Sequence, residues 1–169
     1  SDCGTTKMCG ISGIMYKTGG RRGVAPIGED LIRMLESMTH RGKDSSGVAV
    51  AGEQLEEDLI VRVWSDGTQA TPDVLARAEE AVLRAGGVVG SIRSRGDFLR
   101  LTVNYEGDLA GLAEALVETQ GVELHSIGRS SEVVKDVGTP VTMDGKHSIG
   151  ELKGTHGIGH VRMATESRV

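Results

Sequence analysis

The sequence predicts a mixed α/β fold on two observations. Segments that alternate apolar and polar residues, as half-buried strands do, are interleaved with segments whose apolar residues recur every three or four positions, as in amphipathic helices. In addition, glycine occurs 25 times in 169 residues, which is typical of a chain with many tight turns and close backbone approaches. A chain of this length suits one domain with a sizeable core, so we expect sheets and helices packed in layers.

The first part of the chain predicts a strand, a helix and a second strand. We expect strands at residues 9–16 and 48–51, and between them a helix that begins at Glu29 and Asp30 and ends near His40. The two acidic side chains suit the positive end of the helix dipole. The helix has one apolar stripe, which consists of Leu31, Met34, Leu35 and Met38.

The middle of the chain, at about residues 53–155, predicts further strands and helices and contains no motif that indicates chemistry. The strands are expected at 59–64, 88–92, 99–103, 122–127 and 133–137. One helix has Thr71 as its cap and Pro72 at its first position, and another begins at Asp108. The buried stripes expected on them are Val74, Ala78, Ala81, Val82 and Ala85 on the first, and Leu109, Leu112, Ala113 and Leu116 on the second. We expect this segment to be an insertion packed on or into the core sheet.

Composition and charge argue against several classes of partner. The net charge of −5, with lysines and arginines scattered along the chain, gives no basic surface for nucleic acid. One Trp, one Phe and two Tyr are also too few for a base-stacking platform. No apolar run approaches the ~18–20 residues that a membrane span needs, and no secretory leader is recognisable. We therefore expect neither a nucleic acid nor a membrane partner.

The cysteines and histidines predict a reduced setting without a metal. Cys3 and Cys9 fit neither a disulfide framework nor a zinc pattern, and the five histidines form no metal-binding pair on an expected helix. We expect a cytoplasmic protein with no metal site.

The stretch from Met8 to Ile14 is the strongest candidate for a catalytic site. Cys9 follows Met8 directly and stands at the start of an apolar run. Cleavage after Met8 would leave Cys9 as the first residue, with a thiol and a free α-amine on one residue. Because the reference pKa values are ~8 for the amine and ~8.5 for the thiol, the amine can accept the thiol proton near neutral pH without a histidine. The structural alternative is a free cysteine buried as a small apolar side chain.

Two further polar motifs follow. The first is the loop Arg41-Gly42-Lys43-Asp44-Ser45-Ser46-Gly47, which leads into the strand at 48–51. The second is Gly159-His160-Val161-Arg162-Met163-Ala164-Thr165-Glu166-Ser167, which begins as a buried strand and places Arg162 near the end of that strand. An arginine there either belongs to a structural ion pair or holds a substrate carboxylate through its planar, two-pronged set of donors.

These three motifs, in this order, resemble those of the class II glutamine amidotransferases, which are N-terminal-nucleophile hydrolases. The third motif, together with residues 128–138, is most similar to the glutaminase subunits of glutamate synthase-type enzymes. The resemblance covers residues 9–169. It implies a four-layer α/β/β/α sandwich that is incomplete at its C-terminal end, and it leaves residues 1–8 as a leader or remnant.

The resemblance implies that the chain hydrolyses L-glutamine to glutamate and ammonia through a thioester on Cys9. Arg162 would bind the α-carboxylate of glutamine, and Met163 and Thr165 would shape the pocket around it. The supporting residues that it implies are Gly10, Arg41, Asp44, His160 and Glu166. Arg41 and Asp44 would order the loops around the nucleophile, or form a structural salt link in a turn. The ammonia would pass to a synthase domain or subunit, to which any redox cofactor would belong, so no cofactor is expected in this chain.

Departures from the family pattern leave two alternatives open. Lys43 stands where many relatives have proline. The Asn-Gly pair that supplies the oxyanion hole in the family is missing, since Asn104 is followed by Tyr105. A chain that keeps residues 1–8 also has no free amine at Cys9. One alternative is a non-catalytic regulatory or assembly module that retains the fold, and the other is an amidohydrolase that acts on a different amide.

Overall fold

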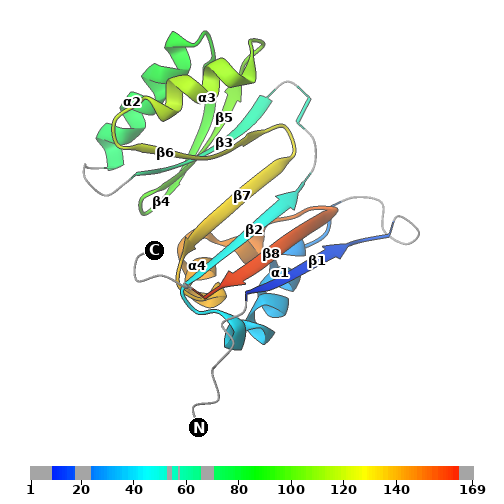
Figure 1. Cartoon of the computed structure of the whole chain (residues 1–169). Coiled ribbons are helices and arrows are strands. Elements are labelled where there is room, and N and C mark those ends of the chain that lie inside the picture. Colours follow the sequence, from blue (N-terminus) through cyan, green and yellow to red (C-terminus); the bar gives the residue numbers. More distant parts are fainter. Residues whose placement is uncertain (1–8, 18–23, 53–54, 57, 66–70, 164–169) are drawn as a thin grey trace. The chain divides into compact units, whose positions relative to one another are not determined.

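The structure, a computed structural model, describes residues 9–17, 24–52, 55, 56, 58–65 and 71–163 (Figure 1). The chain forms two compact units, one of residues 1–53 with 135–169 and the other of residues 54–134. We call them the terminal unit and the central unit and describe each by itself. The leader expected at residues 1–8 lies outside the described part of the chain.

The terminal unit is built on a four-stranded sheet with the order β1-β8-β2-β7. Its strands are β1 (Gly10–Met15), β2 (Ser45–Ala51), β7 (Ser131–Val137), whose first residues belong to the central unit, and β8 (His156–Arg162). Strand β8 pairs antiparallel with both β1 and β2. The helical segments of this unit are α1 (Ile27–Ser37), α4 (Pro140–His147) and the short 3₁₀ turns η1 (Thr39–Arg41) and η2 (Ile149–Glu151).

Glycines on β8 allow α1 to pack closely against the sheet. A Cβ atom at Gly157 would lie 3.0 Å from Leu31 Cδ1, and one at Gly159 would lie 2.8 Å from Leu35 Cδ1. Both leucines are fully buried. Because successive residues of a strand point to opposite faces, β8 turns its glycines and Val161 toward the helix and exposes the residues between them. The sheet therefore has one face covered by helix and one open face.

Helix α1 also contacts η2 through Gly28. The Gly28 amide donates to the carbonyl oxygen of Leu152 at 3.0 Å, and a Cβ atom at Gly28 would lie 1.8 Å from the carbonyl oxygen of Ile149. Since that neighbour is backbone, no rotamer change can make room for a side chain at this position. The approach of η2 to the first turn of α1 thus requires a glycine.

Asp136 on β7 holds two side chains of α4. Its Oδ2 atom accepts from Lys146 Nζ at 2.9 Å and lies 3.2 Å from His147 Nε2, and its Oδ1 atom accepts from the Val137 amide at 2.7 Å. Burial by itself raises the pKa of the Asp136 carboxyl, but these hydrogen bonds outweigh it, so the pKa is lowered from its ordinary value. The ionised carboxylate therefore helps to fix α4 on the sheet.

The central unit has the order β-α-β-β-α-β and a four-stranded antiparallel sheet, β4-β5-β3-β6. Its elements are β3 (Asp58–Ser65), α2 (Thr71–Arg84), β4 (Val88–Arg95), β5 (Phe98–Asn104), α3 (Leu109–Val117) and β6 (Val122–Gly128). This is the split β-α-β arrangement of ferredoxin-like units. Alternate residues of β3 and β5 form one buried core with apolar residues of α2 and α3. The two helices therefore cover one face of this sheet (Figure 1).

The predicted mixed α/β class and most predicted elements are confirmed. Every strand expected between residues 9 and 137 is present, and the helices expected after Thr71 and Asp108 are formed. The Asp108 side chain accepts from the Ala110 amide at 3.3 Å, as expected of a helix cap. Four residues of the stripe predicted on α2 are fully buried, namely Val74, Ala78, Ala81 and Val82.

Four details of the prediction differ from the structure. Helix α4 was not predicted, because only Pro140, Met143 and His147 of its eight residues are buried and they make no extended apolar stripe. Leu109 was expected in the core but is 48% exposed, since it lies in the first turn of α3. Thr71 is inside α2 rather than its cap, and its hydroxyl donates to Asp97 at 3.0 Å. The expected insertion at about 53–155 is longer than the central unit, because residues 135–155 belong to the terminal unit.

Within the described residues, no helix is long and apolar enough to cross a membrane.

The contact at Gly28 predicts a large effect of one methyl group. Gly28→Ala should lower the free energy of unfolding by about 1–3 kcal/mol or more, because the new Cβ overlaps the Ile149 carbonyl. Gly145→Ala is the matched control: Gly145 is also helical and nothing lies within 4 Å of its Cβ position, so stability should be unchanged or rise by up to about 1 kcal/mol. Urea unfolding of both variants measures the difference. Equal stability of the two would contradict this packing.

The lowered pKa of Asp136 predicts a pH dependence of stability. The ionised carboxylate contributes its full stabilisation above the unfolded-state pKa of ~3.9, and that stabilisation is lost as the pH falls through the lower folded-state pKa. Asp136→Asn should therefore be less stable than the parent near pH 6, and the difference should shrink below about pH 4. Denaturant unfolding at several pH values measures it, with the exposed Glu36→Gln as control. A difference that does not change with pH would exclude this role.

Candidate functional site

Strand pairing brings the first and third sequence motifs together. Gly10 of β1 is opposite Val161 of β8, and these two residues directly adjoin Cys9 and Arg162 in the sequence. On the other side of β8, Ser45 of β2 is opposite Arg162. Adjacent antiparallel strands have opposed Cα atoms about 4.5–5.5 Å apart. Residues from three distant parts of the sequence thus meet at one end of the terminal-unit sheet.

Cys9 and Arg162 are on the open face of that sheet. Gly10 and Val161 are buried under the helical layer, whereas Ile11 and Ile158 are 77% and 60% exposed. Because side chains alternate along a strand, Cys9 shares the face of Ile11, and Arg162 shares the face of Ile158. Both Cys9 and Arg162 are exposed. A thiol and a guanidinium therefore face the same side, away from α1.

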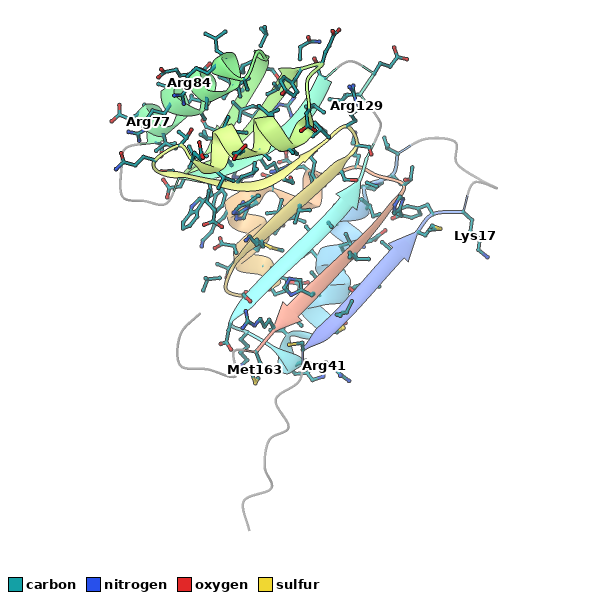
Figure 2. All side chains as sticks on the ribbon, turned by 45° about the horizontal axis from the view of Figure 1, so that its top comes forward. Lys17, Arg41, Arg77, Arg84, Arg129 and Met163 are labelled. Atoms are coloured by element: carbon teal, nitrogen blue, oxygen red, sulfur yellow. The ribbon has the colours of Figure 1, made fainter. Side chains whose placement is uncertain are left out.

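The second motif supports the end of β8 through its backbone. A Cβ atom at Gly42 would lie 2.3 Å from the carbonyl carbon of Arg162, so only glycine allows the loop this close. The Asp44 amide donates to the Arg162 carbonyl oxygen at 3.1 Å, and the Asp44 carbonyl accepts from the Gly138 amide at 2.8 Å. Figure 2 shows Arg41 and Met163 at this same end of the sheet. The loop at residues 42–44 is therefore held against the end of β8 by backbone contacts.

Gly10 allows a close approach of a different kind. A Cβ atom there would lie 3.1 Å from Val161 Cγ2 and 3.2 Å from Met38 Sδ, on the helical side of the sheet. Both distances are tighter than ordinary contacts. Gly10 therefore lets the end of α1 pack directly beneath the residue that follows Cys9.

Of the remaining predicted site residues, some lie in the part of the chain that the structure describes and others lie outside it. His160 is exposed on the open face, opposite Ile11 and Gly47, and makes no side-chain hydrogen bond to any described residue. Met163 directly follows β8 and is partly buried. Thr165 and Glu166 lie outside the described residues. The structure thus brings Cys9, the Arg41–Asp44 loop and Arg162 to one sheet end.

Two features of this region were not predicted. Ser45, which pairs with Arg162, belongs to the second motif, but nothing in the sequence indicates its partner. Large apolar side chains of β1 and β8 are exposed on the open face, namely Ile11, Met15 and Ile158. The glycines beside Ile11 and Ile158 in the sequence were the available signal that these apolar side chains lie on the face away from the helices. Among the described residues, no three His, Cys, Asp or Glu side chains are grouped closely enough to hold a metal ion.

Comparison with known proteins finds two homologues. The chain is 33% identical over 167 residues to a Methanothermobacter thermautotrophicus protein named "Putative glutamine amidotransferase", a match that covers 96% of this chain and 54% of that protein. It is 32% identical over 164 residues to the Rhizobium meliloti "Glutamine amidotransferase-like protein GlxB", covering 96% of this chain and 52% of that protein. The chain spans about half the length of these curated relatives. No protein-family model matches it.

The fit of Gly42 against β8 predicts a local effect of substitution. Gly42→Ala should push the loop away from the Arg162 carbonyl and break the hydrogen bond of the Asp44 amide. Hydrogen exchange of the Asp44 amide should then quicken by about tenfold or more, while amides in α4 stay protected. NMR detects both sets of amides, and Gly145→Ala serves as control. Unchanged protection of the Asp44 amide would show that the loop is not held in this way.

Proposed function

We propose that this chain, a distant homologue of glutamine amidotransferases, carries the nucleophile and the carboxylate-binding arginine of a glutaminase. The observation that supports the proposal is the pairing of Gly10 with Val161, since Cys9 precedes Gly10 and Arg162 follows Val161. A nucleophile and a carboxylate clamp must be within one amino acid's length of each other. Neighbouring positions on paired strands meet that requirement.

The proposed reaction begins with Cys9 as the N-terminal residue of the processed protein. Its α-amine takes the thiol proton, and the thiolate attacks the side-chain amide carbon of glutamine. The tetrahedral intermediate expels ammonia, which carries the proton held by the amine, and leaves a thioester on Cys9. Water then attacks the thioester carbon, its proton returns to sulfur, and glutamate leaves. A thiol that is exposed on the open face can be reached by the substrate.

Arg162 is proposed to bind the α-carboxylate of glutamine. A guanidinium offers two parallel N–H donors that match the two oxygens of a carboxylate. Arg162 is exposed at the end of β8, and its carbonyl is fixed by the loop at residues 42–44. Met163 and Thr165 would shape the pocket beside it. The residues proposed to support the site are Gly10, Arg41, Asp44, His160 and Glu166.

We further propose that a second sheet packs on the apolar part of the open face, leaves the end with Cys9 and Arg162 within reach of substrate, and completes the four-layer sandwich. The support is the exposure of Ile11, Met15 and Ile158, which are 77%, 73% and 60% exposed and lie on one face. Apolar side chains grouped on a sheet face are typical of a surface that packs against another layer. The homologues are also about twice as long as this chain, which provides sequence for such a layer.

The ammonia is proposed to pass to a synthase domain or subunit, which would hold any redox cofactor. This part of the proposal is supported by the similarity of residues 159–167 to glutamate synthase-type glutaminases. A non-catalytic module with the same fold remains the alternative, since a chain that keeps residues 1–8 has no free amine at Cys9. Intact-mass measurement of the cellular protein distinguishes the two, because only the catalytic form must begin at Cys9.

The proposed roles of Cys9 and Arg162 predict different kinetic effects. In the processed full-length protein, Cys9→Ala should lower kcat for glutamine hydrolysis by about a thousandfold or more, because no other group forms the thioester. Arg162→Gln should raise KM by roughly 10- to 100-fold, because it removes a charge-assisted pair of hydrogen bonds. Arg33→Gln on the exposed surface of α1 should leave both constants unchanged. Glutamate release measures all three.

Normal glutaminase activity in correctly processed Cys9→Ala would end the enzymatic proposal. An increase in KM for Arg33→Gln as large as that for Arg162→Gln would remove the assigned role of Arg162.

A further inference from the structure

The face of the central-unit sheet away from α2 and α3 carries a row of arginines, of which Arg93 is exposed and Arg62 and Arg100 are mostly covered. Arg93 of β4 is opposite Arg100 of β5, and Arg100 is opposite Arg62 of β3, so three guanidinium side chains stand side by side on adjacent strands. All three are on the face away from α2 and α3, because the residues that alternate with them on β3 and β5 form the core. Like charges that are directly opposite in a sheet destabilise it. Strand pairing by itself therefore does not favour three arginines at these positions.

One carboxylate offsets part of the charge. Glu132 Oε2 accepts from Arg100 Nε at 3.1 Å and from Arg62 Nε, and its Oε1 accepts from Arg100 Nη2 at 3.1 Å. Burial lowers the pKa of the Arg62 guanidinium, and repulsion from Arg100 acts in the same direction against the attraction of Glu132. Among the described residues, no acidic side chain pairs with Arg93. The row therefore keeps an excess of positive charge.

This positive face contrasts with the rest of the unit. Residues 54–134 contain fourteen acidic residues, seven arginines and no lysine. Four of the seven arginines are on the face away from α2 and α3, namely Arg62, Arg93, Arg95 and Arg100. Asp58 and Glu123 share this face, on β3 and β6, so the excess of positive charge is confined to the side of β4 and β5, where it suits an anion.

An aromatic pair lies directly beside the arginine row. Trp64 and Phe98 are opposite each other on β3 and β5, two residues along from Arg62 and Arg100 on the same face. Their rings are nearly parallel, with centroids 6.1 Å apart and planes 19° apart. Phe98 also has His125 at a centroid distance of 6.1 Å. Flat rings next to guanidinium groups provide both stacking surface and charge.

We propose that this face binds a phosphate-bearing ligand, with the phosphate held by Arg93 and Arg100 and any attached ring placed against Trp64 and Phe98. Phosphate suits the row better than a lone carboxylate, because its oxygens are distributed around phosphorus and can accept at once from the Arg93 guanidinium and from the Arg100 donors that Glu132 does not use. Glu132 holds Arg62 and Arg100 in position and leaves Arg93 available. The proposal stands apart from the glutaminase proposal, because none of its residues belongs to that site.

The test uses the fluorescence of Trp64, which is the only tryptophan in the chain. The 169-residue chain is titrated with inorganic pyrophosphate and, separately, with ADP, at low and at moderate salt. Saturable change in Trp64 emission with either probe is expected, with weaker binding at higher salt. Tighter binding of ADP that Phe98→Leu abolishes identifies a nucleotide as the source of the phosphate. Equal binding of the two probes identifies the phosphate alone, and both results support the site.

Substitutions locate the binding. Arg93→Gln and Arg100→Gln should each weaken binding by about tenfold or more, whereas Arg84→Gln on α2 (Figure 2) should not change it. Since Arg100→Gln also removes a partner of Glu132, Arg93→Gln is the decisive variant, and circular dichroism checks that each folds. No saturable change with either probe at millimolar concentration overturns the proposal. Equal weakening by Arg84→Gln and Arg93→Gln also overturns it.

Discussion

The antiparallel pairing of β8 with β1 and β2 is the constraint on which the candidate site depends. It sets residues near position 9 beside residues near position 162, and both beside the start of β2 at Ser45. Glycines at 157 and 159 make this central place in the sheet compatible with α1, since larger residues would meet Leu31 and Leu35. The same strand thus organises the core on one face and the exposed residues on the other.

Close backbone contacts rather than side-chain ion pairs fix the geometry around Arg162. Gly42 touches the Arg162 carbonyl group, the Asp44 amide donates to it, and Gly138 donates in turn to Asp44. Backbone contacts of this kind have no rotamer freedom to lose, so they hold a strand end more firmly than long charged side chains do. The Arg162 side chain is exposed, while its own backbone is fixed by these contacts.

Strand β7 contributes one important carboxylate to each unit. Glu132 is shared by two arginines of the central unit, and Asp136 is shared by Lys146 and by His147, whose side chain is almost fully buried, in the terminal unit. In both places hydrogen bonds from cationic partners lower the pKa of the carboxyl despite burial. Each of these ionised carboxylates therefore joins two side chains, and Asp136 connects β7 to α4.

Most elements and the order of the motifs could be predicted from local sequence patterns, because both are local properties. Two-residue alternation located β3, three- and four-residue spacing located α1 and α2, and the motifs around Cys9, Arg41 and Arg162 were recognisable as strings. The homologues support that recognition at about one-third identity. Helix α4 escaped because a short helix with few buried residues has no periodic stripe. The fold alone pairs Gly10 with Val161, places Gly42 against the end of β8 and aligns three arginines on one face. Each of these depends on the register between strands far apart in the chain, and register is chosen by packing over the whole sheet rather than by any one segment.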